Sequence, residues 1–173
     1  IAPTFGVENM MGTNPLAFAF PTDEAFPFCL DCATSIIQRG KVEKAVREGK
    51  PVPPGLVVGE NGQTMTDSKA ILDALIRGSA ALAPLGGIGE ETGGYKGYGL
   101  AAVVEILSAA LCGGPFMKGL NGRKADGSLD EFRLSHFFLV LDPEAFMGLD
   151  TFKKTAGDIC RSLRASKKAP GQE

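Results

Sequence analysis

A glycine-rich segment that runs into a long apolar stretch constrains this chain most. Residues 93–99 hold four glycines and one lysine, and residues 100–112 after them are almost wholly apolar, which is typical of a loop leading into a helix. The first N–H groups of a helix lack intrahelical partners and carry partial positive charge, so they suit an anion, and Lys96 adds a full charge. Plain packing of the helix start is the alternative interpretation, and both stay open at this point.

The spacing of this segment excludes two familiar phosphate-binding motifs. A Walker loop needs Gly-Lys-Ser/Thr, whereas Lys96 follows Tyr95 and precedes Gly97. A Rossmann fingerprint that begins at residues 87–89 would need its third glycine at position 92, where threonine stands. An anion site here would therefore belong to another fold.

Composition limits the classes of partner. The 173 residues include 18 basic and 20 acidic side chains, with no basic stripe, so no nucleic-acid partner is expected. The longest apolar stretch, 100–112, is too short to cross a membrane and is broken by Glu105, so the sequence predicts a soluble protein. Four scattered cysteines suit a reducing compartment, which favours the cytoplasm. Ile1 at the start and a Pro-Gly loop at the end indicate a piece of a longer protein.

Residues suited to metal or nucleophilic chemistry are few. Cys29 and Cys32 have redox-motif spacing, but they fall in a predicted strand where positions i and i+3 face opposite sides, and no second pair completes a zinc site. The single histidine, His136, begins an apolar run, and a structural role is favoured over a catalytic one. No metal site is predicted.

The order of secondary structure elements predicts an α+β fold, because hairpin-like strands mix with packing helices rather than alternating with them strictly. Strands are expected at 16–20, 26–31, 56–58 and 136–141. Helices are expected at 33–48, 99–112 and 150–165, of which 99–112 is expected to be buried. A further short helix is expected after a cap at 66–68.

Asp31 is the most interesting carboxylate, because it ends an apolar strand just before a predicted helix. A carboxylate in this place commonly faces a ligand crevice, but it can equally cap the helix that follows. The residues by themselves favour neither interpretation.

Five motifs stand in chain order at residues 12–18, 31–35, 40–42, 84–87 and 96–100. Together they resemble the type-2 malate/L-lactate dehydrogenase family, which also includes ureidoglycolate and sulfolactate dehydrogenases and cyclic-imine-carboxylate reductases. The resemblance covers essentially the whole chain. It implies a non-Rossmann fold with a mixed, largely antiparallel sheet packed with helices, usually in a homodimer, and a nicotinamide-dependent reaction on small 2-hydroxy and 2-oxo acids.

The resemblance also implies where the cofactor binds. Three segments contact it in the family, and the aspartate of the first also supports the catalytic histidine. The matching residues here are Asp31, Cys32 and Ala33, then Lys96 and Gly97, then Pro170, Gly171 and Gln172, with Glu173 at the end of the last segment.

The proton-donating histidine of the family lies in an N-terminal region, and this chain begins downstream of it. Residues 1–173 are therefore expected to be the cofactor-binding central domain of a longer dehydrogenase, truncated at both ends, which binds poorly and does not turn over alone. The alternative is a non-catalytic dinucleotide-binding or dimerisation module.

Cofactor and substrate choice are less constrained. An acidic side chain such as Asp23 in the turn 21–24 accepts a bond from the ribose 2′-OH and repels a 2′-phosphate, which favours NAD over NADP. The same residue can equally be a solvated turn residue. Malate or lactate is the substrate that the resemblance implies first.

Overall fold

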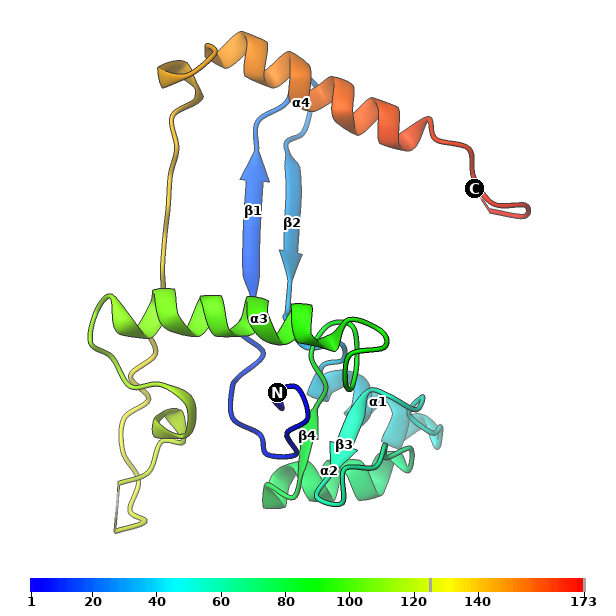
Figure 1. The fold of residues 1–173 in the computed structure, drawn as a ribbon, viewed down its shortest axis with the longest axis vertical. Helices are drawn as coiled ribbons and strands as arrows, with labels where there is room; N and C mark the ends of the chain where they lie inside the picture. Colours follow the sequence, from blue (N-terminus) through cyan, green and yellow to red (C-terminus); the bar gives the residue numbers. More distant parts are fainter. Residues whose placement is uncertain (125, 173) are drawn as a thin grey trace. The chain divides into compact units, whose positions relative to one another are not determined.

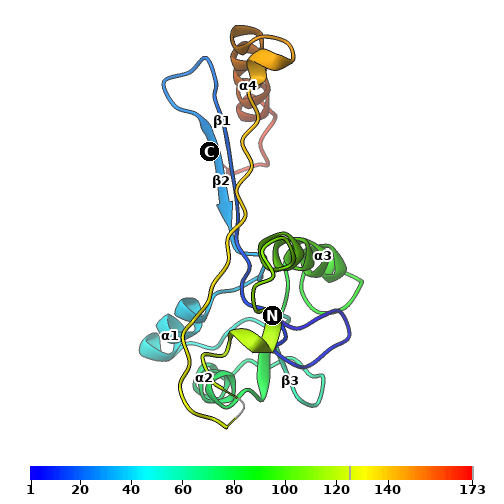
Figure 2. The same cartoon turned by 90° about the vertical axis from the view of Figure 1, so that its left-hand side faces the viewer.

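The computed structural model describes residues 1–124 and 126–172, and the chain divides into two compact units. Unit 1 comprises Ile1–Leu16 and Ala33–Phe137, and unit 2 comprises Ala17–Cys32 with the residues from Phe138 onward. Each unit thus joins segments that are distant in sequence, as the colours of Figures 1 and 2 show.

Unit 1 holds the longer series of elements. Strands β3 (Val57–Gly59) and β4 (Ala80–Leu82) pair antiparallel, with Val57 opposite Leu82 and Gly59 opposite Ala80. A π-helical turn, Ile106–Ala110, and a 3₁₀ turn, Met117–Leu120, follow α3 (Gly94–Glu105), the last α-helix of unit 1. The helices and strands in chain order are α1 (Arg39–Glu48), β3 (Val57–Gly59), α2 (Ser68–Arg77), β4 (Ala80–Leu82) and α3 (Gly94–Glu105).

The core of unit 1 lies where α1 and α2 meet this small sheet (Figure 1). Val42 of α1, Val57 of β3 and Ile71 of α2 are fully buried. Burying each such side chain contributes about 1.5–3 kcal/mol to folding. Asp67 caps α2 by accepting a hydrogen bond from the Ala70 N–H at 2.8 Å, which confirms the predicted cap.

Unit 2 contains the other two-stranded sheet and the last helix. Strand β1 (Leu16–Phe20, its first residue in unit 1) pairs with β2 (Phe28–Cys32), which confirms the hairpin-like pair with a small shift of the second strand. A 3₁₀ turn, Pro143–Ala145, precedes α4 (Leu149–Arg164), whose bounds match the prediction within one residue. These small sheets packed with helices make the fold α+β, as predicted.

The prediction of a helix from residue 33 is wrong, because α1 begins only at Arg39. Residues 34–36 instead run beside residues 83–85: the Ile36 N–H donates to the Ala83 carbonyl, and the Leu85 N–H donates to the Thr34 carbonyl, both at 2.9 Å. This pairing occupies the backbone groups that the first helical turns would have used.

Two further predictions need correction. Residues 136–141 form no strand among the described residues. Leu139 and Val140 are 69% and 90% exposed, so neither face of this apolar run is buried as in a strand that packs on a core. Helix α3 starts at Gly94 rather than residue 99, and it is not buried all round, since Leu100 and Val103 are nearly half exposed.

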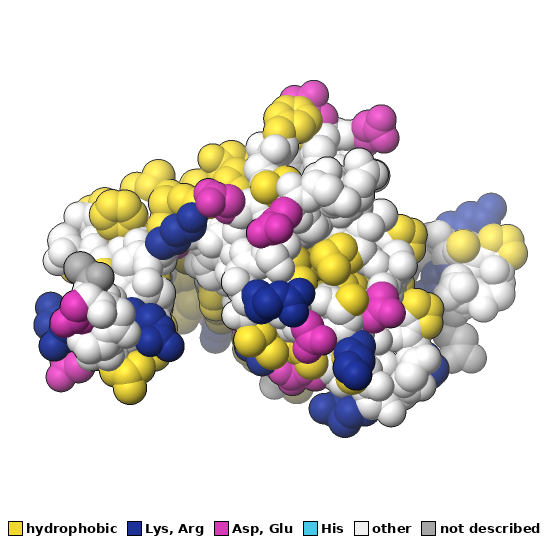
Figure 3. Space-filling view, turned by 90° about the horizontal axis from the view of Figure 1, so that it is seen from below, with side chains coloured by type: hydrophobic (Ala, Val, Ile, Leu, Met, Phe, Trp, Pro, Cys, Tyr) yellow, Lys and Arg dark blue, Asp and Glu magenta, His cyan; other side chains and the backbone are white. Residues whose placement is uncertain are grey.

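The surface carries both charge signs together with hydrophobic groups. On the face drawn in Figure 3, Lys and Arg side chains lie among Asp and Glu, with hydrophobic side chains between them. Within residues 1–124 and 126–172, none of the helices has the length and apolar character needed to cross a bilayer.

Candidate functional site

The start of α3 presents Lys96 to solvent. Gly93 caps the helix in the left-handed conformation, at φ 83°, and makes no side-chain cap hydrogen bond. The first turn contains no acidic residue. The Lys96 ammonium lies 5.7 Å from the centroid of the exposed Tyr95 ring. This helix start therefore places an exposed cation in its first turn, where the helix dipole also suits an anionic group of a ligand, while the Lys96 N–H itself donates to the Gly93 carbonyl at 3.0 Å.

Glycines 94 and 97 serve packing in this segment. A Cβ on Gly94 would lie 2.0 Å from the Gly87 carbonyl oxygen, and a Cβ on Gly97 would lie 2.2 Å from the Leu85 carbonyl oxygen. Both are far inside van der Waals contact, so α3 approaches the loop at 85–89 only because these side chains are missing. Packing thus explains these two glycines, and ligand contact by Gly97 stays a prediction.

The same packing brings two predicted cofactor segments together in unit 1. Ala33 is followed by Thr34, whose carbonyl accepts from the Leu85 N–H at 2.9 Å. The Leu85 backbone in turn abuts the α-carbon of Gly97, next to Lys96. Ala33 and Lys96, which are 63 positions apart in the printed sequence, therefore flank one short stretch of backbone.

Asp31 and Cys32 are the last two residues of β2, in unit 2. The Asp31 side chain is exposed, and Cys32 is half-buried. Because α1 begins at Arg39 with Gln38 as its N-cap, Asp31 does not cap that helix. Of the two interpretations of this carboxylate, the helix cap is thereby wrong and the ligand-facing role stays a prediction.

Asp23 is engaged with α4 inside unit 2. Its two carboxylate oxygens accept from the two terminal nitrogens of Arg161 at 2.9 and 3.1 Å, a bidentate pair. This hydrogen-bonded guanidinium is the main cause that holds the pKa of the Asp23 carboxyl below its usual value. Asp23 is therefore more than a solvated turn residue, although its oxygens retain acceptor capacity for a ribose hydroxyl.

The predicted C-terminal loop lies in unit 2, after α4. Pro170, Gly171 and Gln172 are exposed; Gly171 has φ 78°, and the Gln172 N–H donates to the Ala169 carbonyl at 3.1 Å in a tight turn. Glu173 lies outside the described residues. Contact of this loop with a cofactor stays a prediction.

Residues 1–124 and 126–172 contain neither a metal-binding cluster nor a disulfide bond. No group of three or more His, Cys, Asp or Glu side chains there is placed to hold a metal ion. Cys29, Cys32, Cys112 and Cys160 are all free thiols.

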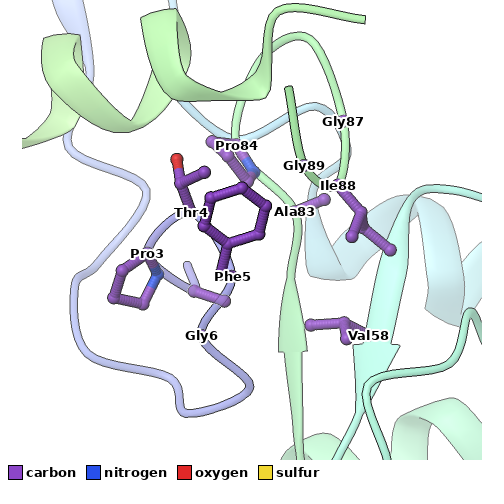
Figure 4. A pocket seen from close by; sticks show the side chains of 11 residues that line it. Pro3, Thr4, Phe5, Gly6, Val58, Ala83, Pro84, Gly87, Ile88 and Gly89 are labelled. Carbon is purple, nitrogen blue, oxygen red and sulfur yellow. The ribbon is translucent and has the colours of Figure 1, made fainter. Parts of the chain in front are cut away.

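A shallow pocket in unit 1 was not predicted from the sequence. Figure 4 shows the Phe5 ring beside Pro84 and the glycine loop at 87–89, with Val58 below. Phe5 is a non-glycine residue at φ 64°, and its side chain is 77% exposed. The Thr4 hydroxyl oxygen is buried with no hydrogen-bond partner. Nothing in the residue pattern at 1–6 marks this place.

Sequence reasoning also missed three buried polar residues of unit 1. Thr34 is fully buried, while Ser35 and Glu105 are 5% and 8% exposed. Glu105 reads in the sequence only as an interruption of an apolar helix. The sequence feature that could have identified it is a carboxylate at a position where the helical periodicity predicts a buried apolar residue.

Comparison with known proteins identifies the family. The model of the malate/L-lactate dehydrogenase family matches residues 1–173. The chain is 40% identical over 170 residues to malate dehydrogenase of Pyrococcus horikoshii, covering 98% of this chain and 44% of that protein. It is 35% identical over 176 residues to L-sulfolactate dehydrogenase of Methanocaldococcus jannaschii, covering all of this chain and 45% of that one.

A solved structure agrees. Malate dehydrogenase from Entamoeba histolytica superposes with a TM-score of 0.90 at 44% identity, covering 99% of this chain and 47% of that one. The chain thus spans less than half the length of these relatives. With the family model matched from end to end, the chain belongs to the malate/L-lactate dehydrogenase family of oxidoreductases.

Proposed function

We propose that this chain is the nicotinamide-dinucleotide-binding part of a dehydrogenase that interconverts small 2-hydroxy and 2-oxo acids, with malate and lactate as the first candidate substrates. The observation that carries the proposal is the junction in unit 1, where Leu85 links Thr34 to the start of α3 beside Lys96. Relatives named malate dehydrogenase and L-sulfolactate dehydrogenase support this class of substrate.

The chemistry of this junction fits a dinucleotide. A pyrophosphate binds to positive charge and to the start of a helix, and α3 places the exposed Lys96 in its first turn. Ala33 is half-buried and small, so its backbone can be approached closely. In this proposal Lys96 and the first amides of α3 bind the anionic part, and Ala33 contacts the rest.

Asp31 has the role of a positioning carboxylate in the complete enzyme. A bound nicotinamide supplies or accepts the hydride of the reaction. Asp31 accepts an N–H from the histidine that exchanges a proton with the substrate oxygen, and it stabilises the charged imidazolium. In this proposal the proton-exchanging histidine is not His136, the single histidine of this chain, but lies in another part of the longer protein, so this chain alone does not turn over. Asp31→Asn should lower kcat of that longer enzyme by orders of magnitude at unchanged thermal stability; an unchanged kcat would remove this role.

NAD is the favoured cofactor in the proposal. Asp23 and Glu24 form an acidic turn, and a 2′-phosphate placed there would meet their negative charge. Arg161 partly offsets this charge, because its guanidinium contacts both carboxylates. Binding of NADPH more tightly than NADH would contradict the preference for NAD.

The experiment is a fluorescence titration of the chain with NADH and NADPH, which the absence of tryptophan simplifies. Lys96→Ala should weaken binding of both nucleotides by about tenfold, the effect of losing one charge-assisted contact. Lys69→Ala is the matched control, because Lys69 is also an exposed lysine at the start of a helix of unit 1. Equal affinities in the two variants, or no saturable binding, would contradict the proposed site.

A further inference from the structure

A buried carboxylate at the end of α3 makes contacts that the proposed function has not used. Glu105 is 8% exposed. Its Oε2 accepts from the side-chain amide of Asn14 at 2.8 Å, and its Oε1 accepts from the Met117 N–H at 2.5 Å. A carboxylate is costly to bury unless such donors compensate it, so this arrangement is a specific one.

Both partners of Glu105 have unusual backbone conformations. Asn14 and Met117 have φ values of 35° and 48°, and the only other non-glycine residue with positive φ in the described part of the chain is Phe5. Such conformations persist only where surrounding contacts hold them, and they concentrate at functional sites. The helix also changes to π geometry directly after Glu105, a further feature that is frequent at such sites.

The contacts continue from Asn14 to the proposed nucleotide site. The Asn14 amide also donates to the Ala101 carbonyl of α3 at 3.0 Å. The carbonyls of Thr13 and Asn14 both accept from the hydroxyl of fully buried Thr34, at 2.9 and 3.0 Å. Thr34 follows Ala33 in the chain, and its own carbonyl holds Leu85.

We infer that Glu105 is a positioning residue for nucleotide binding. Its carboxylate holds the side chain of Asn14 by a hydrogen bond. The carbonyls of Asn14 and Thr13 in turn hold the hydroxyl of Thr34. Thr34 thereby positions the backbone of Ala33 and Leu85 against the start of α3. The inference rests on the proposed function, because it assigns the end of this series of contacts to the nucleotide. An acceptor of two hydrogen bonds is required, which explains a carboxylate among apolar neighbours.

Two substitutions break this series without enlarging a side chain. Glu105→Gln keeps the size but replaces one carboxylate oxygen by an NH₂ group, so it cannot accept from Asn14 and Met117 on two separate oxygens as Glu105 does. Asn14→Ala removes the next member. Ile71→Val is the control, because it perturbs the fully buried core of unit 1 and makes none of the hydrogen bonds of this series through its side chain.

The test measures three quantities on the unsubstituted chain, the single variants and the Glu105→Gln/Asn14→Ala double variant: the dissociation constant for NADH, the melting temperature, and amide hydrogen exchange at Thr34 and Leu85. We expect Glu105→Gln and Asn14→Ala each to raise the dissociation constant by about tenfold and to speed exchange at both amides. The double variant should bind NADH no more weakly than the single variant with the higher dissociation constant, because both substitutions break the same series of hydrogen bonds. Ile71→Val should lower the melting temperature with an unchanged dissociation constant.

The outcomes separate this inference from the proposed function. If Glu105→Gln left both the NADH affinity and the exchange rate of the Thr34 amide unchanged, the inference would be overturned. It would also be overturned if Ile71→Val lost as much NADH affinity as Glu105→Gln. If the unsubstituted chain does not bind NADH, the proposed function is contradicted, and the exchange at Thr34 and Leu85 still decides whether Glu105 positions this backbone.

Discussion

At the scale of single residues, the glycines of the segment that opens α3 have different tasks. Gly94 and Gly97 lie against backbone of the preceding loop, whereas a Cβ on Gly99 would meet no atom within 4 Å. A run of glycines in a sequence therefore conceals positions where a side chain is forbidden and positions where one is tolerated. Only the three-dimensional neighbours distinguish them.

These neighbours predict opposite effects for two identical substitutions. Gly97→Ala forces a methyl group into the Leu85 backbone and should destabilise the chain by about 1–3 kcal/mol. Gly99→Ala adds a methyl group in open space and removes a flexible residue from a helix, so it should stabilise by up to about 1 kcal/mol. Thermal unfolding of both variants measures the difference, and equal shifts in melting temperature would contradict the packing described for Gly97.

At the scale of elements, the turn between β1 and β2 docks onto α4 within unit 2. The Asp23 N–H donates to the Lys153 carbonyl at 3.2 Å, and Arg161 holds the Asp23 carboxylate. Gly157 makes this approach possible, since a Cβ there would lie 1.8 Å from an oxygen of Asp23. Hydrogen bonding to Arg161 is the main cause of the lowered pKa of Asp23.

The lowered pKa predicts how this contact depends on pH. A carboxyl whose pKa is depressed in the folded state stabilises it fully above the unfolded value, 3.8, and loses this contribution as pH falls through the lower folded value. Exchange of the Asp23 amide should therefore quicken below about pH 3.8 relative to the intrinsic rate. Asp23→Asn should show fast exchange already at neutral pH. An unchanged amide in that variant would mean that the ion pair does not hold the turn.

Elements that depend on neighbouring residues were predictable from the sequence, and those that depend on distant ones were not. The cap of α2 by Asp67 and the extent of α4 follow from local patterns, and both were confirmed. The start of α1 was not predictable, because residues 34–36 pair with a segment about fifty positions away. Glu105 was missed in the same way, since its partner Asn14 lies 91 positions from it.

At the scale of the whole molecule, the predicted cofactor residues are shared between the two units. Ala33, Lys96 and Gly97 belong to unit 1, and the structure brings them to one stretch of backbone at Leu85. The residues in unit 2 are Asp23, Asp31, Cys32, Pro170, Gly171 and Gln172. The junction in unit 1 is therefore the part of the predicted site whose geometry lies within one unit.

The most direct test of this account is an amide NMR map of the isotope-labelled chain titrated with NADH. The account predicts saturable shifts that cluster at Ala33, Thr34, Leu85 and Lys96, with little change in α2 at the far side of the core, and loss of these shifts in Lys96→Ala. Shifts that cluster elsewhere in unit 1, or a spectrum that NADH leaves unchanged, would contradict the claim that this junction binds the nucleotide.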